Sequence, residues 1–112
     1  MYPNLNCTGF GAQDVYTRLT QRGISLTQLS GITGDIIKRK VVAQVKLNKK
    51  VIVGTNITPP RGAEVSHITL AVAYDNKSQA IIFNDPLFGA SKKLEADGYT
   101  IKWLTALAYL VN

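Results

Sequence analysis

The sequence predicts one α+β domain, in which N-terminal helices pack on a C-terminal antiparallel sheet. Two observations lead to this class. Apolar residues recur at helical spacing up to about residue 48, and they alternate with period two in several segments beyond residue 50. A chain of 112 residues, 46% of them hydrophobic, is long enough for a single core, and no linker or repeat divides it. We therefore expect residues 1–112 to form one domain.

Helices are expected in the first half of the chain. The first covers residues 9–22, because its apolar residues share one helical face, Thr8 stands at the N-cap position and Gly23 follows the last turn. A short second helix is expected at residues 25–29, and a third at residues 35–48.

The third helix has the clearest pattern. Ile37, Val41 and Val45 recur every four residues and would form one buried stripe. Either Thr33 or Asp35 can cap its start, since both carry a side-chain oxygen that accepts a backbone hydrogen bond.

Strands are expected in the second half. Residues 50–55 form a short apolar run typical of a buried strand, and residues 65–74 alternate with period two. Turn-forming residues at 75–77 join the latter strand to a returning one at residues 79–84, which makes a hairpin. The apolar tract at residues 106–111 can close the sheet.

Three chemically reactive side chains stand out, and the hairpin explains the spacing of two of them. Cys7 comes just before the first helix, where the positive end of the helix dipole stabilises a thiolate. His67 lies early in one hairpin strand and Asp85 at the end of the other, so the two should meet across the ladder. An imidazole positioned by a carboxylate can remove a thiol proton, which predicts Cys7 as nucleophile, His67 as general base and Asp85 as its positioning residue.

These pieces together resemble the papain-like cysteine peptidases of the bacteriocin-processing type. The matching parts are Cys7 followed by Gly9-Phe10-Gly11, the strand HITLAVAYD from His67 to Asp75, and IIFNDP from Ile81 to Pro86. The tract LNKKVIVGTN resembles the segment before the histidine strand in that family. The resemblance touches most of the chain and implies a papain-like fold and hydrolysis of an amide or peptide bond.

The sequence departs from this family at two positions. Members usually have glycine directly after the cysteine, where this chain has Thr8. They also have a glutamine shortly before the cysteine as an oxyanion donor, and that position is Met1 here. Asn4 and Asn6 are the candidate replacements, together with the backbone N–H of Cys7.

A basic surface is the second functional candidate. The chain has 13 basic and 7 acidic residues, a net charge of +6, which favours an acidic partner. Such a surface can bind the phosphate backbone of RNA or simply form a solvated helix face. The candidate binding residues are Arg18, Arg22, Lys38, Arg39, Lys40, Lys46, Lys49 and Lys50.

A small, basic, papain-like domain also resembles the toxin tips of bacterial polymorphic and contact-dependent inhibition systems. That resemblance implies a bacterial protein acting in the cytoplasm of a target cell and an acidic immunity protein as partner. Two alternatives to the hydrolase remain open: a basic toxin tip that cleaves RNA, and an inactive papain-like binding module.

Composition argues against a metal site and against a membrane protein. One cysteine and one histidine do not suffice for a His/Cys zinc cluster, so neither metal nor cofactor is expected. No apolar run approaches the length of a membrane span, and the N-terminus lacks a signal-peptide pattern. We expect a soluble domain that is monomeric when free.

Overall fold

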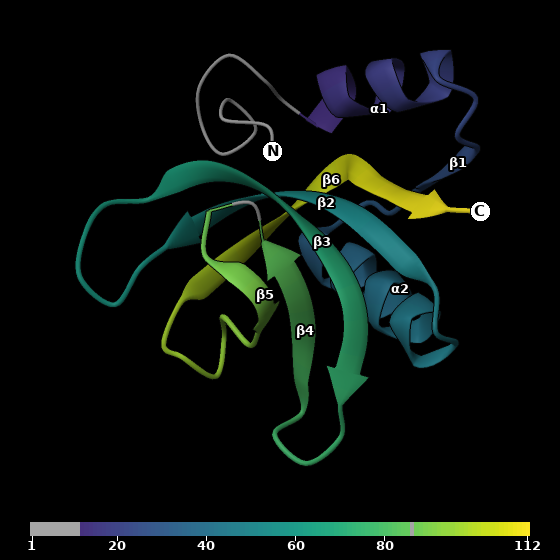
Figure 1. The fold of residues 1–112 in the computed structure, drawn as a ribbon. Coiled ribbons are helices and arrows are strands. Elements are labelled where there is room, and N and C mark those ends of the chain that lie inside the picture. The colour runs from purple at the N-terminus through teal and green to yellow at the C-terminus, as the bar shows by residue number, and fades with distance from the viewer. Residues whose placement is uncertain (1–11, 86) are drawn as a thin grey trace.

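The computed structural model describes residues 12–85 and 87–112 of the chain (Figure 1). Within these residues two helices accompany a six-stranded sheet in the order β1-β6-β2-β3-β4-β5, with every neighbouring pair antiparallel. The mixed class with an antiparallel sheet is thus confirmed. The elements are α1 (Ala12–Gln21), β1 (Leu26–Leu29), α2 (Gly34–Lys46), β2 (Lys50–Thr58), β3 (Val65–Asp75), β4 (Ala80–Asp85), β5 (Gly89–Lys92) and β6 (Thr100–Val111).

Helix α1 ends and helix α2 begins close to where the sequence predicts. After α1, Gly23 adopts a φ of +83°, a left-handed conformation that favours glycine, and its N–H donates to the carbonyl of Thr20. At the start of α2, the hydroxyl of Thr33 accepts a hydrogen bond of 3.3 Å from the N–H of Ile36, which makes Thr33 the N-cap. The expected cap at Thr8 lies outside the described residues.

The prediction of a short helix at residues 25–29 is wrong, because this segment forms β1. Strand β1 pairs with the end of β6, where Leu26 lies opposite Val111 and Leu29 opposite Ala108. A five-residue segment gains too few internal hydrogen bonds to hold a helix, whereas pairing with β6 satisfies its backbone and partly buries both leucines. Strand β5 was not predicted either, since its four residues are too short to show a period.

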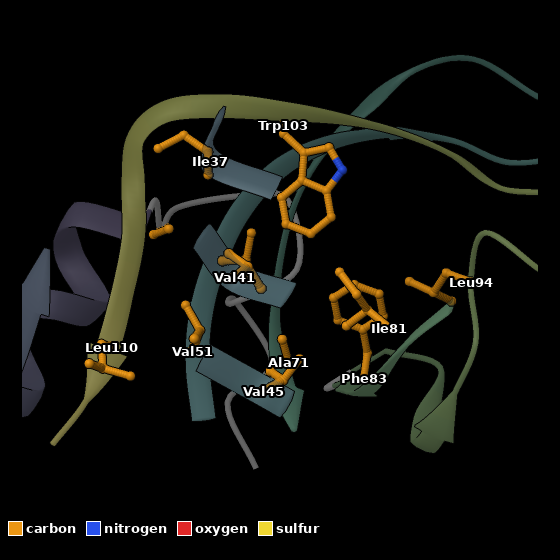
Figure 2. Close-up of a cluster of buried hydrophobic side chains, with 12 residues drawn as sticks. Ile37, Val41, Val45, Val51, Ala71, Ile81, Phe83, Leu94, Trp103 and Leu110 are labelled. Atoms are coloured by element: carbon orange, nitrogen blue, oxygen red, sulfur yellow. The ribbon is translucent and has the colours of Figure 1, made fainter. Parts of the chain in front are cut away.

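The two helices cover opposite faces of the sheet (Figure 1). On one face α2 buries Ile37, Val41 and Val45, as its spacing predicts, against Val51 and other apolar residues of the sheet. Figure 2 shows this cluster, which extends past Trp103 to the β4 and β5 region; its further members include Ala71, Ile81, Phe83, Leu94 and Leu110.

Helix α1 packs on the other face of the sheet. Its residues Val15, Tyr16 and Leu19 lie against a smaller cluster built around Ile52, Ile68 and Tyr109. The rings of Tyr16 and Tyr109 are 4.8 Å apart between centroids. The sheet is therefore the middle layer of three. Each side chain on β3 points either to the face that α1 covers or to the face that α2 covers.

The β3–β4 hairpin turns where the sequence predicts. The carboxylate of Asp75 accepts hydrogen bonds from the backbone N–H groups of Lys77 and Ser78, and the Lys93 ammonium lies 2.9 Å from it. The hydroxyl of Ser78 donates a further hydrogen bond to it. These hydrogen bonds, that from Ser78 first, hold the pKa of Asp75 well below its usual range.

No helix among the described residues has both the length and the apolar character needed to cross a membrane.

Candidate active site

His67 and Asp85 meet across the hairpin, as the sequence predicts. The Nε2 atom of His67 lies 2.6 Å from Oδ2 of Asp85, and the two side chains are 1% and 0% exposed. A hairpin that turns at residues 75–78 would place Tyr74 opposite Gln79, but Gln79 belongs to the turn and Tyr74 lies opposite Ile81. Leu70 lies opposite Asn84, so Asp85 is a diagonal neighbour of His67, which is still within reach of an imidazole.

The turn after β4 fixes the orientation of the Asp85 carboxylate. Its second oxygen, Oδ1, accepts hydrogen bonds from the backbone N–H groups of Leu87 at 2.9 Å and Phe88 at 3.1 Å. Burial opposes ionisation of this carboxyl group, but the hydrogen bonds from His67, Leu87 and Phe88 outweigh it and lower its pKa. Asp85 is thus a carboxylate with one oxygen held by the backbone and the other presented to His67.

This arrangement determines which nitrogen of His67 carries the proton when the ring is neutral. A carboxylate only accepts hydrogen bonds, so Nε2 donates its proton to Asp85 and Nδ1 keeps a lone pair. The ring also packs against Phe88, with centroids 5.5 Å apart, and Phe88 in turn packs against Tyr99. Nδ1 is therefore the nitrogen that can accept a proton from a further group.

Two buried polar side chains lie in the same row of the sheet. Thr55 on β2 is directly opposite His67 on β3 and directly opposite Trp103 on β6. The hydroxyl of Thr55 and Nε1 of Trp103 are buried, and neither has a hydrogen-bond partner in the part of the chain that the structure describes. Neither residue was predicted from the sequence to belong to the site, although a threonine at a core-facing position of an apolar strand is a visible exception to the pattern.

The imidazole faces the α2 side of the sheet. Directly opposed residues share a face and successive residues alternate, so His67 lies on the same face as Thr55, Val53 and Ala71. Val53 and Ala71 belong to the core that α2 covers, whereas α1 packs on the opposite face.

The predicted nucleophile cannot be placed relative to this pair. Cys7 and the oxyanion candidates Asn4 and Asn6 lie outside the described residues. Cys7 precedes Ala12, the first residue of α1, by five positions, and five residues of extended chain span at most about 17 Å.

The candidate basic residues are distributed over several surfaces, and some have intramolecular contacts. The ammonium group of Lys38 forms an ion pair of 3.0 Å with Glu95, and that of Lys40 donates to the carbonyl of Ser30. The ammonium group of Lys46 lies 4.7 Å from the centre of the Tyr74 ring. The remaining candidates have exposed side chains on α1, α2, the start of β2 and the turns that follow the two helices; these residues are Arg18, Arg22, Arg39, Lys49 and Lys50.

A search of the described residues finds no group of three or more potential metal-binding side chains. Comparisons of the chain with models of protein families, with curated proteins and with solved structures find no match.

Proposed function

We propose that this protein is a cysteine-dependent hydrolase of amide or peptide bonds, with Cys7 as nucleophile, His67 as general base and Asp85 as the residue that positions His67. The observation that carries the proposal is the buried contact of 2.6 Å between His67 and Asp85. A surface histidine can pair with a carboxylate incidentally, but this pair is withdrawn from solvent and its carboxylate is fixed by two backbone N–H groups.

The proposed reaction follows from the protonation states. Nδ1 of His67 takes the proton of the Cys7 thiol, and the thiolate adds to the carbonyl carbon of the substrate. The carboxylate of Asp85 stabilises the positive charge that forms on the ring. The imidazolium then returns its proton to the leaving amine as the carbon–nitrogen bond breaks, which leaves a thioester on Cys7. Water, deprotonated by Nδ1, hydrolyses the thioester, releases the acid and restores the thiol.

The proposal requires the N-terminal segment to bring Cys7 to Nδ1 of His67. Because α1 packs on the face opposite to His67, residues 7–11 must pass the end of the sheet for Cys7 to reach Nδ1. His67 is the third residue of β3, close to one end of that strand. A papain-like arrangement of the whole domain belongs to the same proposal, and the chain order of helix, histidine strand and aspartate strand supports it.

The biological setting that we propose is a bacterial toxin domain acting in the cytoplasm of a target cell. The net charge of +6 supports an acidic immunity protein as its partner.

The activity test compares amide and RNA substrates. The chain is incubated with a library of tetrapeptide coumarin amides and, separately, with total transfer RNA. We expect release of coumarin that is lost in Cys7→Ala and in His67→Gln, while both variants keep the native circular dichroism spectrum.

The matched control reverses charge instead of removing the nucleophile, with Lys38→Glu and Lys40→Glu combined. The proposal expects this variant to release coumarin at the native rate. Cleavage of RNA that survives Cys7→Ala but is lost in the charge-reversed variant would refute the hydrolase and support the nuclease alternative.

A further inference from the structure

A groove of about 630 Å³ lies between α1 and the sheet, on the face opposite to His67. Val15 and Leu19 of α1 form one wall, and Ile52, Ile68 and Leu70 of β2 and β3 form the floor. Its size and apolar lining are those of small-molecule sites in proteins. Asp85 also contributes to the lining, but its carboxylate is buried and bonded to His67. The groove therefore adjoins the candidate active site at Asp85.

The charged side chains at the groove that remain exposed are basic. Arg18 lies on α1, Arg22 directly follows the last residue of that helix, and Lys50 stands at the start of β2. Asp14 lies one turn before Arg18 and is not part of the groove lining. Arg22 and Lys50 thus place two cations at the mouth of an apolar groove, which is complementary to a ligand with one anionic end.

The floor of the groove argues against a peptide as the occupant. Strands β2 and β3 are interior strands of the sheet, each paired on both sides, so their backbone groups are already bonded. An extended peptide needs free backbone donors and acceptors along its path. A hydrocarbon chain needs only apolar contact, which the side chains of Ile52, Ile68 and Leu70 provide.

We propose that this groove binds a free fatty acid, with the hydrocarbon chain between α1 and the floor and the carboxylate at Arg22 and Lys50. The proposal does not rest on the proposed hydrolase activity, because the residues that would hold the carboxylate, Arg22 and Lys50, take no part in the proposed reaction.

The test uses two fluorescent probes that share one ring system. Anilinonaphthalene sulfonate carries an anionic group and N-phenylnaphthylamine lacks it, so their difference isolates the contribution of the basic residues. The test variant combines Arg22→Gln and Lys50→Gln. The matched control combines Arg39→Gln and Lys49→Gln, which removes the same charge outside the groove. Laurate serves as the competing fatty acid, and Trp103 emission with circular dichroism verifies the native fold.

We expect the test variant to bind the sulfonate about tenfold more weakly, since two partly exposed ion pairs are lost, and to bind the uncharged probe as the native chain does. The control variant should bind both probes normally, and laurate should displace both. Leu70→Gln should weaken both probes together. Equal changes for the two probes, no displacement by laurate, or displacement only by phosphatidylglycerol vesicles would overturn the proposal.

Discussion

Replacing Asp85 by asparagine should move the proton of His67 from one ring nitrogen to the other. In the native chain Oδ1 of Asp85 accepts from the N–H groups of Leu87 and Phe88, while Oδ2 accepts from Nε2 of His67. An asparagine amide keeps its oxygen toward the two backbone donors, because an NH2 group there would face donors alone. Its NH2 group then faces Nε2, which must become an acceptor, so the proton moves to Nδ1.

The size of the effect follows from the bonds that change. Three charge-assisted hydrogen bonds to the carboxylate become neutral ones, but the cost of burying its charge is removed as well, so the net loss should be about 1–1.5 kcal/mol of the free energy of unfolding. Asp85→Ala should cost more, about 3–5 kcal/mol, because it leaves a buried imidazole and two N–H groups without their acceptor. If the chain is the proposed hydrolase, Asp85→Asn should lower kcat by about 10⁴-fold, since Nδ1 can no longer accept a proton.

The assay is unambiguous because His67 is the only histidine in the chain. Nitrogen–proton correlation spectra, recorded where the ring is neutral, report directly which nitrogen is protonated. Urea unfolding followed by the emission of Trp103, the only tryptophan, gives the stability change. Asp75→Asn is the matched control, because it makes the same substitution at a carboxylate of the hairpin turn. The reasoning is refuted if the native ring carries its proton on Nδ1, or if Asp85→Asn leaves the tautomer unchanged.

Three further predictions concern stability. The pKa of Asp85 is lower in the folded chain than the ~3.9 of an unfolded aspartate, so its contribution to the free energy of unfolding is complete above about pH 4 and is lost as the pH falls further. Urea unfolding between pH 6 and pH 3 should show this loss, and Asp85→Asn should make the free energy of unfolding depend less on pH in this range. Thr55→Val should raise the free energy of unfolding by about 1 kcal/mol, since it removes a buried hydroxyl without a partner, whereas a loss of stability would mean that the hydroxyl is satisfied. Gly34→Ala should lower it by about 1–3 kcal/mol, because the added Cβ would lie 2.4 Å from the carbonyl oxygen of Trp103; a variant as stable as the native chain in urea would contradict this.

The parts of the fold that the sequence predicts are those in which one periodicity extends over two or more turns or a whole strand. The stripe of Ile37, Val41 and Val45 places α2 correctly, and the alternation of residues 65–74 places β3. Segments 26–29 and 89–92 are too short to show a period, and their strand conformation comes from pairing with β6 and β4. The partner of β1 lies more than 70 residues further along the chain, which local sequence does not encode, and so β1 was mistaken for a helix.

The sequence predicts the part of the candidate site that the β3–β4 hairpin determines. The spacing of His67 and Asp85 predicts their contact even though the register is shifted, because a diagonal neighbour in a ladder is still within reach of a histidine ring. The sequence does not predict which face of the sheet receives α1, because amphipathic helices of similar character can pack on either side. The row formed by Thr55, His67 and Trp103 also depends on the pairing of β6 with β2, which joins segments far apart in the chain.

The alkylation rate of Cys7 by iodoacetamide as a function of pH tests the central claim most directly. Cys7 is the only cysteine, so intact mass reports its modification alone. The account predicts a rate that remains high well below pH ~8.5, where a free thiol is protonated, and that loses this advantage in His67→Gln and in Asp85→Asn but not in Asp75→Asn. An alkylation profile that follows an ordinary thiol, or one that is the same in the native chain and in His67→Gln, would contradict the pairing of Cys7 with His67.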